Sequence, residues 1–198
     1  MHRSTSDRIR GLTPHGTKWG RLFSVLCFLI LATSSLCQTP QELAAKFKAL
    51  PHVLSVKTVG QSGRETFDIT FQQPVDHRNP RGQKFGQHVF ILHRDFAKPV
   101  ILGTEGYAAN RPSGGELTRI LGEPNLITVE HRYFGRSMPN PIVWKQLTVK
   151  NAADDMHEVV MAFRRLYKGK WVSTGASKGG QTALYYKCYY PNDVDAVV

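Results

Sequence analysis

The chain has 198 residues, of which 41% are hydrophobic and 10% aromatic, which suits one globular core and excludes a disordered or fibrous protein. The formal net charge is +11, but lysines and arginines are scattered among acidic residues instead of clustering with aromatic side chains, which argues against nucleic-acid binding. The sequence has no CxxC pair, HExxH helix, phosphate-binding GxxxxGKS/T loop or internal repeat, so no metal or nucleotide cofactor is expected.

Residues 1–37 have the pattern of a secretory signal peptide. Basic side chains precede an apolar run from Leu22 to Leu31, and small residues follow it. The run is shorter than the roughly 20 apolar residues of a membrane-spanning helix, so we expect removal after export and no stable membrane span. Cleavage after Ser34 or after Cys37 fits the pattern, whereas the bulky Leu36 disfavours a lipid anchor on Cys37. The product is therefore expected to be secreted or periplasmic.

Residues 38–65 are interpreted as an N-terminal extension that precedes the main domain. Within it, 40–50 places apolar side chains at helical spacing, and Pro51 ends the predicted helix. Two alternating segments, 66–71 and 87–92, predict strands, and the sequence Asn-Pro-Arg-Gly at 79–82 supplies turn chemistry between them. We expect these strands to form an antiparallel hairpin at the start of a sheet.

From Pro99 onwards, short apolar strands alternate with helical segments. The runs at 100–102 and 126–129 are almost continuously apolar, as in strands buried on both faces. The remaining elements are a short helix within 115–121, a helix at 151–167, a strand at 170–174, a helix at 178–190 and an opening strand at 193–198. This alternation predicts an α/β fold with a parallel sheet and right-handed crossovers.

The helix at 151–167 has the clearest pattern, because its apolar residues follow one face at helical spacing. Its ends are also marked. Asn151 is the expected N-cap, Asp154 and Asp155 would occupy the first turn, and Gly169 lies beyond the end.

The turn before the helix at 178–190 has the sequence Gly-Ala-Ser-Lys-Gly-Gly at 175–180. A serine hydroxyl becomes a good nucleophile when it is held clear of its backbone, beside a base and near donors for an oxyanion. A GxSxG turn between a strand and a helix meets the first requirement, because its glycines remove Cβ atoms that would collide. The alternative is a glycine-rich turn without chemistry, but the context favours Ser177 as the nucleophile of an α/β-hydrolase-type enzyme.

Backbone amides near Ser177 are candidates for an oxyanion hole. The N–H of Lys178 lies at the start of the following helix and is the first candidate. The amides of Gly106 and Tyr107 follow the strand at 100–102 and are candidates for the second donor. The alternative for this loop is a tight turn of no catalytic value.

Two carboxylates, those of Glu105 and Glu130, follow neighbouring strands, where ligand-binding loops gather in such sheets. Each is a candidate for binding the charged amino terminus of a substrate. For Glu130, a structural ion pair with Arg132 or Lys178 is the favoured alternative.

No general base is evident. In α/β-hydrolases the acid and then the histidine follow the serine along the chain, but all eight histidines precede Ser177. His131 and His157 are the nearest in sequence, and neither is assigned as the base. Cys188, on the helix after the serine, is expected to be a core residue.

Five blocks of sequence stand in order between Thr66 and Val198. They are FQQPVDH at 71–77, VFILHRDF at 89–96, TEGY at 104–107, VEHRYF at 129–134 and KWVSTGASKGGQT at 170–182. Together they resemble the secreted prolyl tripeptidyl aminopeptidase family of serine peptidases. The prolyl carboxypeptidase and dipeptidyl peptidase family shares the Glu-His-Arg-Tyr block but is less similar around the serine.

The resemblance implies an α/β-hydrolase fold with a helical cap and an exopeptidase that releases short, often proline-containing peptides from free N-termini. Ser177 matches the nucleophile of that family, and its substrates are peptides. Family members are longer, so residues 66–198 would be a partial hydrolase domain that stops after the strand following the nucleophile helix, without the cap, the catalytic Asp or the His. Two alternatives stay open, a catalytically silent truncated relative and an α/β-hydrolase esterase.

Overall fold

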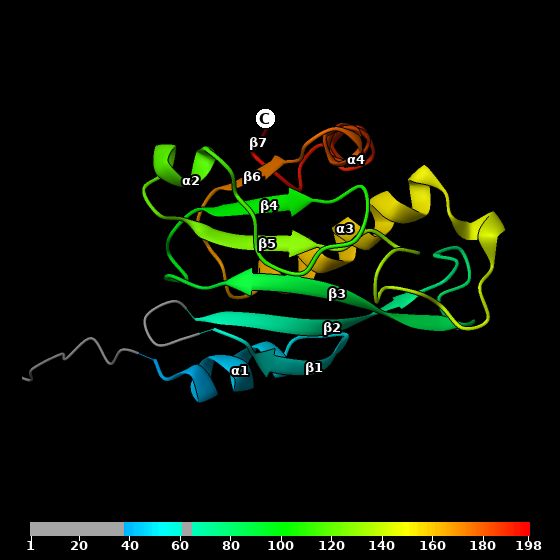
Figure 1. Ribbon diagram of the computed structural model, residues 1–198, viewed down its shortest axis with the longest axis horizontal. Coiled ribbons are helices and arrows are strands. Elements are labelled where there is room, and N and C mark those ends of the chain that lie inside the picture. Colours follow the sequence, from blue (N-terminus) through cyan, green and yellow to red (C-terminus); the bar gives the residue numbers. More distant parts are fainter. Residues whose placement is uncertain (1–37, 61–64) are drawn as a thin grey trace, which may run out of the picture. The chain divides into compact units, whose positions relative to one another are not determined.

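The computed structural model describes residues 38–60 and 65–198, so the predicted signal peptide lies outside the described residues. Within them, the strands form one mixed sheet in the order β1-β2-β3-β5-β4-β6-β7 (Figure 1). The elements in chain order are α1 Pro40–Lys48, β1 Val53–Thr58, β2 Thr66–Pro74, β3 Lys84–Leu92, β4 Val100–Thr104, α2 Leu117–Ile120, β5 Asn125–Val129, the 3₁₀ turn η1 Trp144–Gln146, α3 Val149–Phe163, β6 Trp171–Thr174, α4 Lys178–Tyr189 and β7 Ala196–Val197.

The first three strands are antiparallel. β2 and β3 pair with Thr66 opposite Leu92, which confirms the predicted hairpin. The helix predicted at 40–50 is α1, where Thr39 and Glu42 form a reciprocal capping box. Strand β1, which the sequence pattern did not predict, pairs antiparallel with β2. The segment interpreted as an extension therefore contributes one helix and one strand to the sheet domain.

The other half of the sheet is parallel and positions the loops of the site. β5 pairs with β4, β4 with β6, and β6 with β7, all in parallel, while β3 joins β5 antiparallel. All residues of β4 and β5 are buried, as expected for strands covered on both faces. Thr104 stands opposite Val129, and Gly103 opposite Thr174. The loops that follow β4, β5 and β6 consequently begin side by side at one edge.

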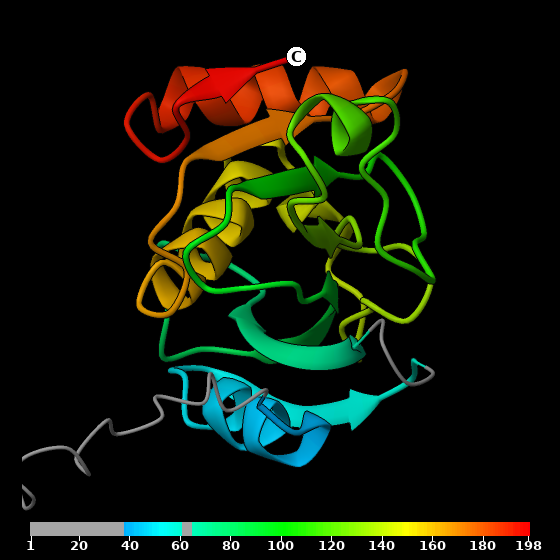
Figure 2. The ribbon, with the colours of Figure 1, turned by 90° about the vertical axis from the view of Figure 1, so that its left-hand side faces the viewer.

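Helices cover both faces of the sheet. Phe47 of α1 lies 5.0 Å from the ring of Phe67 and 6.0 Å from that of Phe163 in α3, so α1 and α3 share one core. Tyr186 of α4 belongs to the same core. The loop before α2 packs on the opposite face, where a Cβ on Gly114 would meet Leu126. In Figure 2, α2 and α3 accordingly lie on opposite sides of β4.

The bounds predicted for the longest helix were wrong at both ends. α3 begins at Val149, because the side chain of Thr148 accepts a hydrogen bond from the Asn151 amide and is the N-cap. Asn151 is instead buried inside the first turn, where its side-chain amide donates to the backbone and side-chain oxygens of Gln146. Asp154 and Asp155 therefore lie beyond the first turn, and the helix ends at Phe163.

The elements around the predicted nucleophile agree with the sequence to within a few residues, since β6, α4 and β7 all lie inside the expected segments. Cys188 was predicted to be in the core, but it is exposed and unpaired. The buried side of α4 is formed by Gly179, Thr182, Ala183 and Tyr186 instead. No helix in residues 38–60 and 65–198 combines the length and apolar character needed to cross a membrane.

Candidate active site

Ser177 stands at the N-cap of α4 with φ +52° and ψ −120°, and its side chain is exposed. A non-glycine residue with positive φ costs on the order of 1–3 kcal/mol, a strain that the surrounding structure must hold in place. The turn is short, because β6 ends at Thr174 and α4 begins at Lys178. This is the geometry expected of a nucleophile elbow, which presents the hydroxyl at the top of the sheet.

The glycines around Ser177 are required by close backbone contacts. A Cβ on Gly175 would lie 2.4 Å from the carbonyl carbon of Gly179 and 2.7 Å from the Thr104 carbonyl oxygen. A Cβ on Gly179 would lie 2.5 Å from that same oxygen. The Thr104 hydroxyl donates to the carbonyl oxygens of Gly179 and Thr174, at 2.9 and 3.2 Å. The end of β4 is therefore packed directly against the elbow.

The loop after β4 also touches the start of α4. A Cβ on Gly106 would lie 2.5 Å from the Lys178 Cβ and 2.9 Å from the Gly179 amide nitrogen. Among the described residues, no acceptor is found for the backbone N–H groups of Gly106, Tyr107 and Lys178. Unpaired amides on two adjoining segments beside a serine are what an oxyanion hole requires.

Glu105 follows β4 and lines a cavity of about 380 Å³ together with Gly175 and Ala176 of the elbow. Its carboxylate forms no hydrogen bond or ion pair with any of the described residues. Burial raises the pKa of Glu105, because the charged form loses hydration. The exposed Glu116 lines the same cavity, so the side chains of its walls include two acidic ones and no basic one. The cavity is thus suited to a cationic group.

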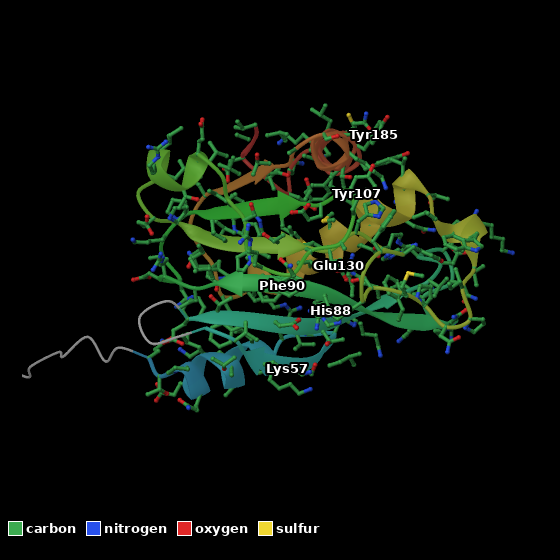
Figure 3. The ribbon with its side chains drawn as sticks, in the orientation of Figure 1. Lys57, His88, Phe90, Tyr107, Glu130 and Tyr185 are labelled. Carbon is green, nitrogen blue, oxygen red and sulfur yellow. The ribbon has the colours of Figure 1, made fainter. Side chains whose placement is uncertain are left out.

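Glu130 has a different environment from the predicted one. It is 1% exposed, and its carboxylate accepts from the amides of Ala109 and Arg136, both at 3.0 Å, and from the Ser137 hydroxyl at 2.6 Å. These contacts join the loops after β4 and β5. Figure 3 shows Glu130 beside the end of β5. The predicted ion pair is wrong, because the Glu130 carboxylate pairs with neither Arg132 nor Lys178. The three loop donors favour a structural role, and the binding of a substrate's amino terminus by Glu130 stays a prediction.

Arg132 pairs instead with Asp155 of α3, and both side chains are fully buried. The guanidinium donates to both carboxylate oxygens of Asp155, at 2.7 and 2.8 Å, and to three backbone carbonyl oxygens. His77 contacts the same carboxylate at 2.7 Å. All five N–H groups of Arg132 are therefore satisfied, and the loop after β5 is attached to α3. The sequence placed Asp155 at a helix end and gave no signal for this pair.

The histidines of the described residues do not supply a base for Ser177. Five of them form hydrogen bonds to other groups: His77 to Asp155, His88 to Asp68, His93 to Tyr167, His131 to the Arg132 carbonyl and His157 to Asp193. The sixth, His52, packs against Phe71. None of these six contacts the hydroxyl of Ser177.

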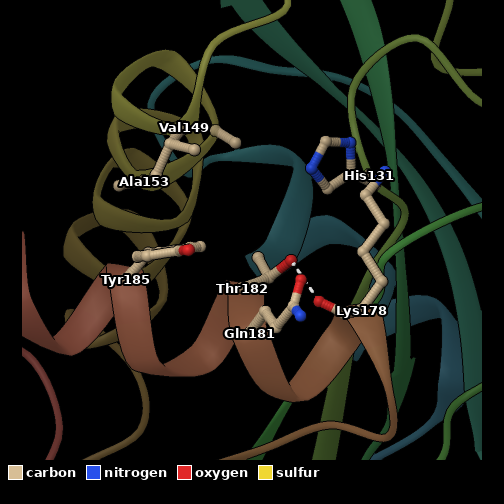
Figure 4. A pocket seen from close by; sticks show the side chains of 8 residues that line it. His131, Val149, Ala153, Lys178, Gln181, Thr182 and Tyr185 are labelled. Atoms are coloured by element: carbon tan, nitrogen blue, oxygen red, sulfur yellow. Dashed lines mark hydrogen bonds between the residues drawn. The ribbon is translucent and has the colours of Figure 1, made fainter.

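His131 is the histidine that shares a pocket with Lys178. The pocket measures about 270 Å³ and is also lined by Val149, Ala153 and Tyr185 (Figure 4). Burial lowers the pKa of His131, which favours the neutral ring. Since a carbonyl only accepts, Nδ1 carries the proton that is donated to Arg132. Within the described residues, no group of three or more His, Cys, Asp or Glu side chains is arranged to hold a metal ion.

The comparisons with known proteins agree with this geometry. The family model described as PS-10 peptidase S37 matches residues 41–198. The chain is 35% identical, over 166 residues, to the prolyl tri/tetrapeptidyl aminopeptidase of Streptomyces mobaraensis. The aligned region covers 83% of this chain but 35% of that protein, so the chain spans about a third of the relative's length.

Solved structures with similar chain paths are more distant. A cold-adapted esterase from an Arctic intertidal metagenomic library has a TM-score of 0.48 at 10% identity, covering 71% of this chain and 62% of its own. Candida antarctica lipase A has a TM-score of 0.44 at 8% identity, covering 77% and 42% respectively. The fold assignment rests on the topology described above: a mixed sheet with antiparallel N-terminal strands, then parallel strands and the elbow, which is the α/β-hydrolase fold.

Proposed function

We propose that this chain, which belongs to the PS-10 peptidase S37 family, carries the nucleophile of a serine exopeptidase that releases short, proline-containing peptides from free N-termini. The observation that carries this proposal is the backbone of Ser177, held at φ +52° in a GxSxG turn between β6 and α4. The relative from Streptomyces mobaraensis carries the name prolyl tri/tetrapeptidyl aminopeptidase, which supports the same substrate class here.

In the proposed reaction, the Ser177 oxygen attacks the scissile carbonyl carbon while a base takes its proton. The oxyanion receives hydrogen bonds from the Lys178 amide and from the amide of Gly106 or Tyr107. The C–N bond then breaks and the proton passes to the leaving amine, which leaves the N-terminal peptide esterified to Ser177. Water hydrolyses this ester, which releases the peptide with a free carboxylate and restores the serine hydroxyl. The substrate's amino terminus would bind in the cavity that Glu105 and Ala176 line. Its ammonium would neutralise the half-buried carboxylate of Glu105 there.

The base and the acid are proposed to come from residues outside this sequence. The described histidines are engaged elsewhere, and the chain matches about a third of its relative. The 198-residue chain by itself would then be catalytically silent. Residues 1–37 are proposed to direct export, because basic residues precede an apolar run and small residues follow it. The mass of the exported product tests this, since removal of the segment predicts a start after Ser34 or Cys37 and retention of it contradicts the proposal.

The activity is tested with the full-length gene product and tripeptide arylamides that end in proline, with free or acetylated N-termini. Replacing Ser177→Ala is expected to lower kcat by on the order of 10⁶-fold. Acetylation is expected to abolish cleavage, because it removes the ammonium. Unchanged turnover in the Ser177→Ala variant would refute the assignment. Hydrolysis of a p-nitrophenyl ester without cleavage of any free peptide would identify an esterase instead.

A further inference from the structure

Three side chains, two from loops and one from the start of α4, meet beside the amides proposed for the oxyanion hole. The ammonium nitrogen of Lys178, at the start of α4, lies 4.7 Å from the ring centre of Tyr107 and 4.4 Å from that of Phe134. The two rings are 5.3 Å apart and nearly perpendicular, at 88°. Tyr107 belongs to the loop after β4, and Phe134 to the loop after β5. We call this group the aromatic clamp.

The rings are the principal partners of this ammonium. Lys178 forms no ion pair with any carboxylate of the described residues, and its side chain is half-buried. Burial lowers the pKa of Lys178, so the charge has lost part of its hydration. A cation within about 6 Å of an aromatic ring centre is attracted to the ring face, and desolvation strengthens the attraction. The contacts to Tyr107 and Phe134 both meet this condition.

The clamp is connected to the amides that would bind the oxyanion. Lys178 and Tyr107 each supply one of those amides, and Gly106 is in contact with the Lys178 stem. The Tyr107 carbonyl accepts from the His131 amide at 3.1 Å, and the His131 carbonyl accepts from the Phe134 amide at 3.2 Å. A shift of the Lys178 side chain would therefore move both the loop after β4 and the start of α4, which carry the proposed oxyanion donors.

We propose that the Lys178 ammonium, held between Tyr107 and Phe134, is a positioning group that fixes the separation of the two amide segments of the oxyanion hole. This inference rests on the proposed function of Ser177. The ammonium does not touch the reacting atoms. It acts by holding the loop after β4 against the start of α4, so that the amides are aligned before the oxyanion forms.

The test uses Lys178→Met, which keeps an unbranched stem and removes the charge, and Lys178→Arg, which keeps a cation for the rings. The matched control is Lys46→Met, because Lys46 lies 5.3 Å from the ring centre of Phe96, away from the elbow. We expect Lys178→Met to lower kcat by about 10- to 100-fold with KM changed less than about threefold, below the 10²–10³-fold loss of a whole oxyanion donor. Lys178→Arg should recover most of the rate, and the control should match the parent.

A second readout does not require peptidase activity. Amide hydrogen exchange of the 198-residue chain should become faster at the hydrogen-bonded amides of Glu105, His131 and Phe134 in Lys178→Met and stay unchanged there in Lys46→Met. Unchanged exchange, or a kcat equal to that of the parent, would overturn the proposal. If the parent cleaves esters but no peptides, the kcat comparison is made on the ester, so the substrate assignment fails while the clamp is still tested. If the parent hydrolyses neither, the exchange result alone decides.

Discussion

Replacing Glu130 by glutamine separates a structural carboxylate from a substrate-binding one. Three donors point at this carboxylate: the Ala109 amide reaches Oε1, while the Arg136 amide and the Ser137 hydroxyl reach Oε2. Glutamine keeps a single acceptor oxygen. Placing that oxygen toward the two donors leaves its NH₂ group facing the Ala109 N–H.

The cost follows from these contacts. A hydrogen bond to a charged group contributes about 1.5–3 kcal/mol, and a buried donor left unpaired costs about 1–3 kcal/mol. Allowing for relaxation of the loop, we expect Glu130→Gln to lower the free energy of unfolding by about 2–4 kcal/mol. With a urea m-value of about 2 kcal/mol/M, in the middle of the usual range for small proteins, the unfolding midpoint would fall by roughly 1–2 M.

The assay is urea unfolding of the 198-residue chain, followed by far-ultraviolet circular dichroism. The control is Glu116→Gln, since Glu116 is exposed and should change the free energy of unfolding by less than about 0.5 kcal/mol. If Glu130→Gln proved as stable as the parent while the full-length protein lost activity on free N-termini, the structural role would be refuted and the substrate-binding role restored.

Four further predictions concern Glu105, the turn that holds Ser177 and the buried ion pair of Arg132. Glu105→Gln should lower kcat/KM on free N-termini by about 10- to 100-fold, as loss of one charged contact implies, without affecting an ester substrate; equal losses on both would contradict it. Because the pKa of Glu105 is raised in the folded state, the folded protein binds this proton more tightly than the unfolded chain does. The free energy of unfolding therefore falls as the pH rises from the ordinary pKa of a glutamate to the raised pKa of the folded state. Glu105→Gln should therefore unfold at slightly higher temperature than the parent at pH 7 and not at low pH, and a lower melting temperature at pH 7 would contradict this. Gly175→Ala should cost at least about 2 kcal/mol in urea unfolding, because its Cβ would overlap the backbone of Gly179; a stable variant would mean that the elbow relaxes easily. Asp155→Ala should cost about 3–5 kcal/mol by leaving Arg132 charged, buried and unpaired, and a cost below 1 kcal/mol would contradict this.

The fold was largely predictable because its parallel part has strong local signals. The runs at 100–102 and 126–129 are apolar throughout, which follows from burial on both faces. β1 has a weaker pattern: Leu54 is 45% exposed, and Lys57 is exposed as well. Its pairing with β2 is a tertiary contact that local alternation does not encode.

The bounds of α3 show why a cap is hard to place from sequence. Both Thr148 and Asn151 are good N-cap residues, and only the side-chain hydrogen bond of Thr148 to the Asn151 amide decides between them. The predicted burial of Cys188 was wrong because of the orientation of α4. Cysteine is most often buried, but position 188 faces away from the side of α4 that packs on the sheet.

In the candidate site as well, local features could be predicted from the sequence and contacts between distant loops could not. The elbow at Ser177 was visible because glycine spacing and strand–turn–helix context are local features. The role of Glu130 was not visible, because its three donors come from loops whose approach depends on the fold. The aromatic clamp likewise joins residues 27 to 71 positions apart, so only their position at the ends of adjoining strands brings them together.

The central claim is that Ser177 is an activated nucleophile only when the rest of the catalytic machinery is present. The most direct measurement is labelling with a fluorophosphonate probe, followed by mass spectrometry of the modified peptide. We expect the full-length gene product to be labelled on Ser177, the Ser177→Ala variant to be unlabelled, and the 198-residue chain to be unreactive, because none of its described histidines contacts the serine. Labelling of full-length protein at another residue would contradict the assignment of Ser177, and Ser177-specific labelling of the 198-residue chain would show that it already contains its base.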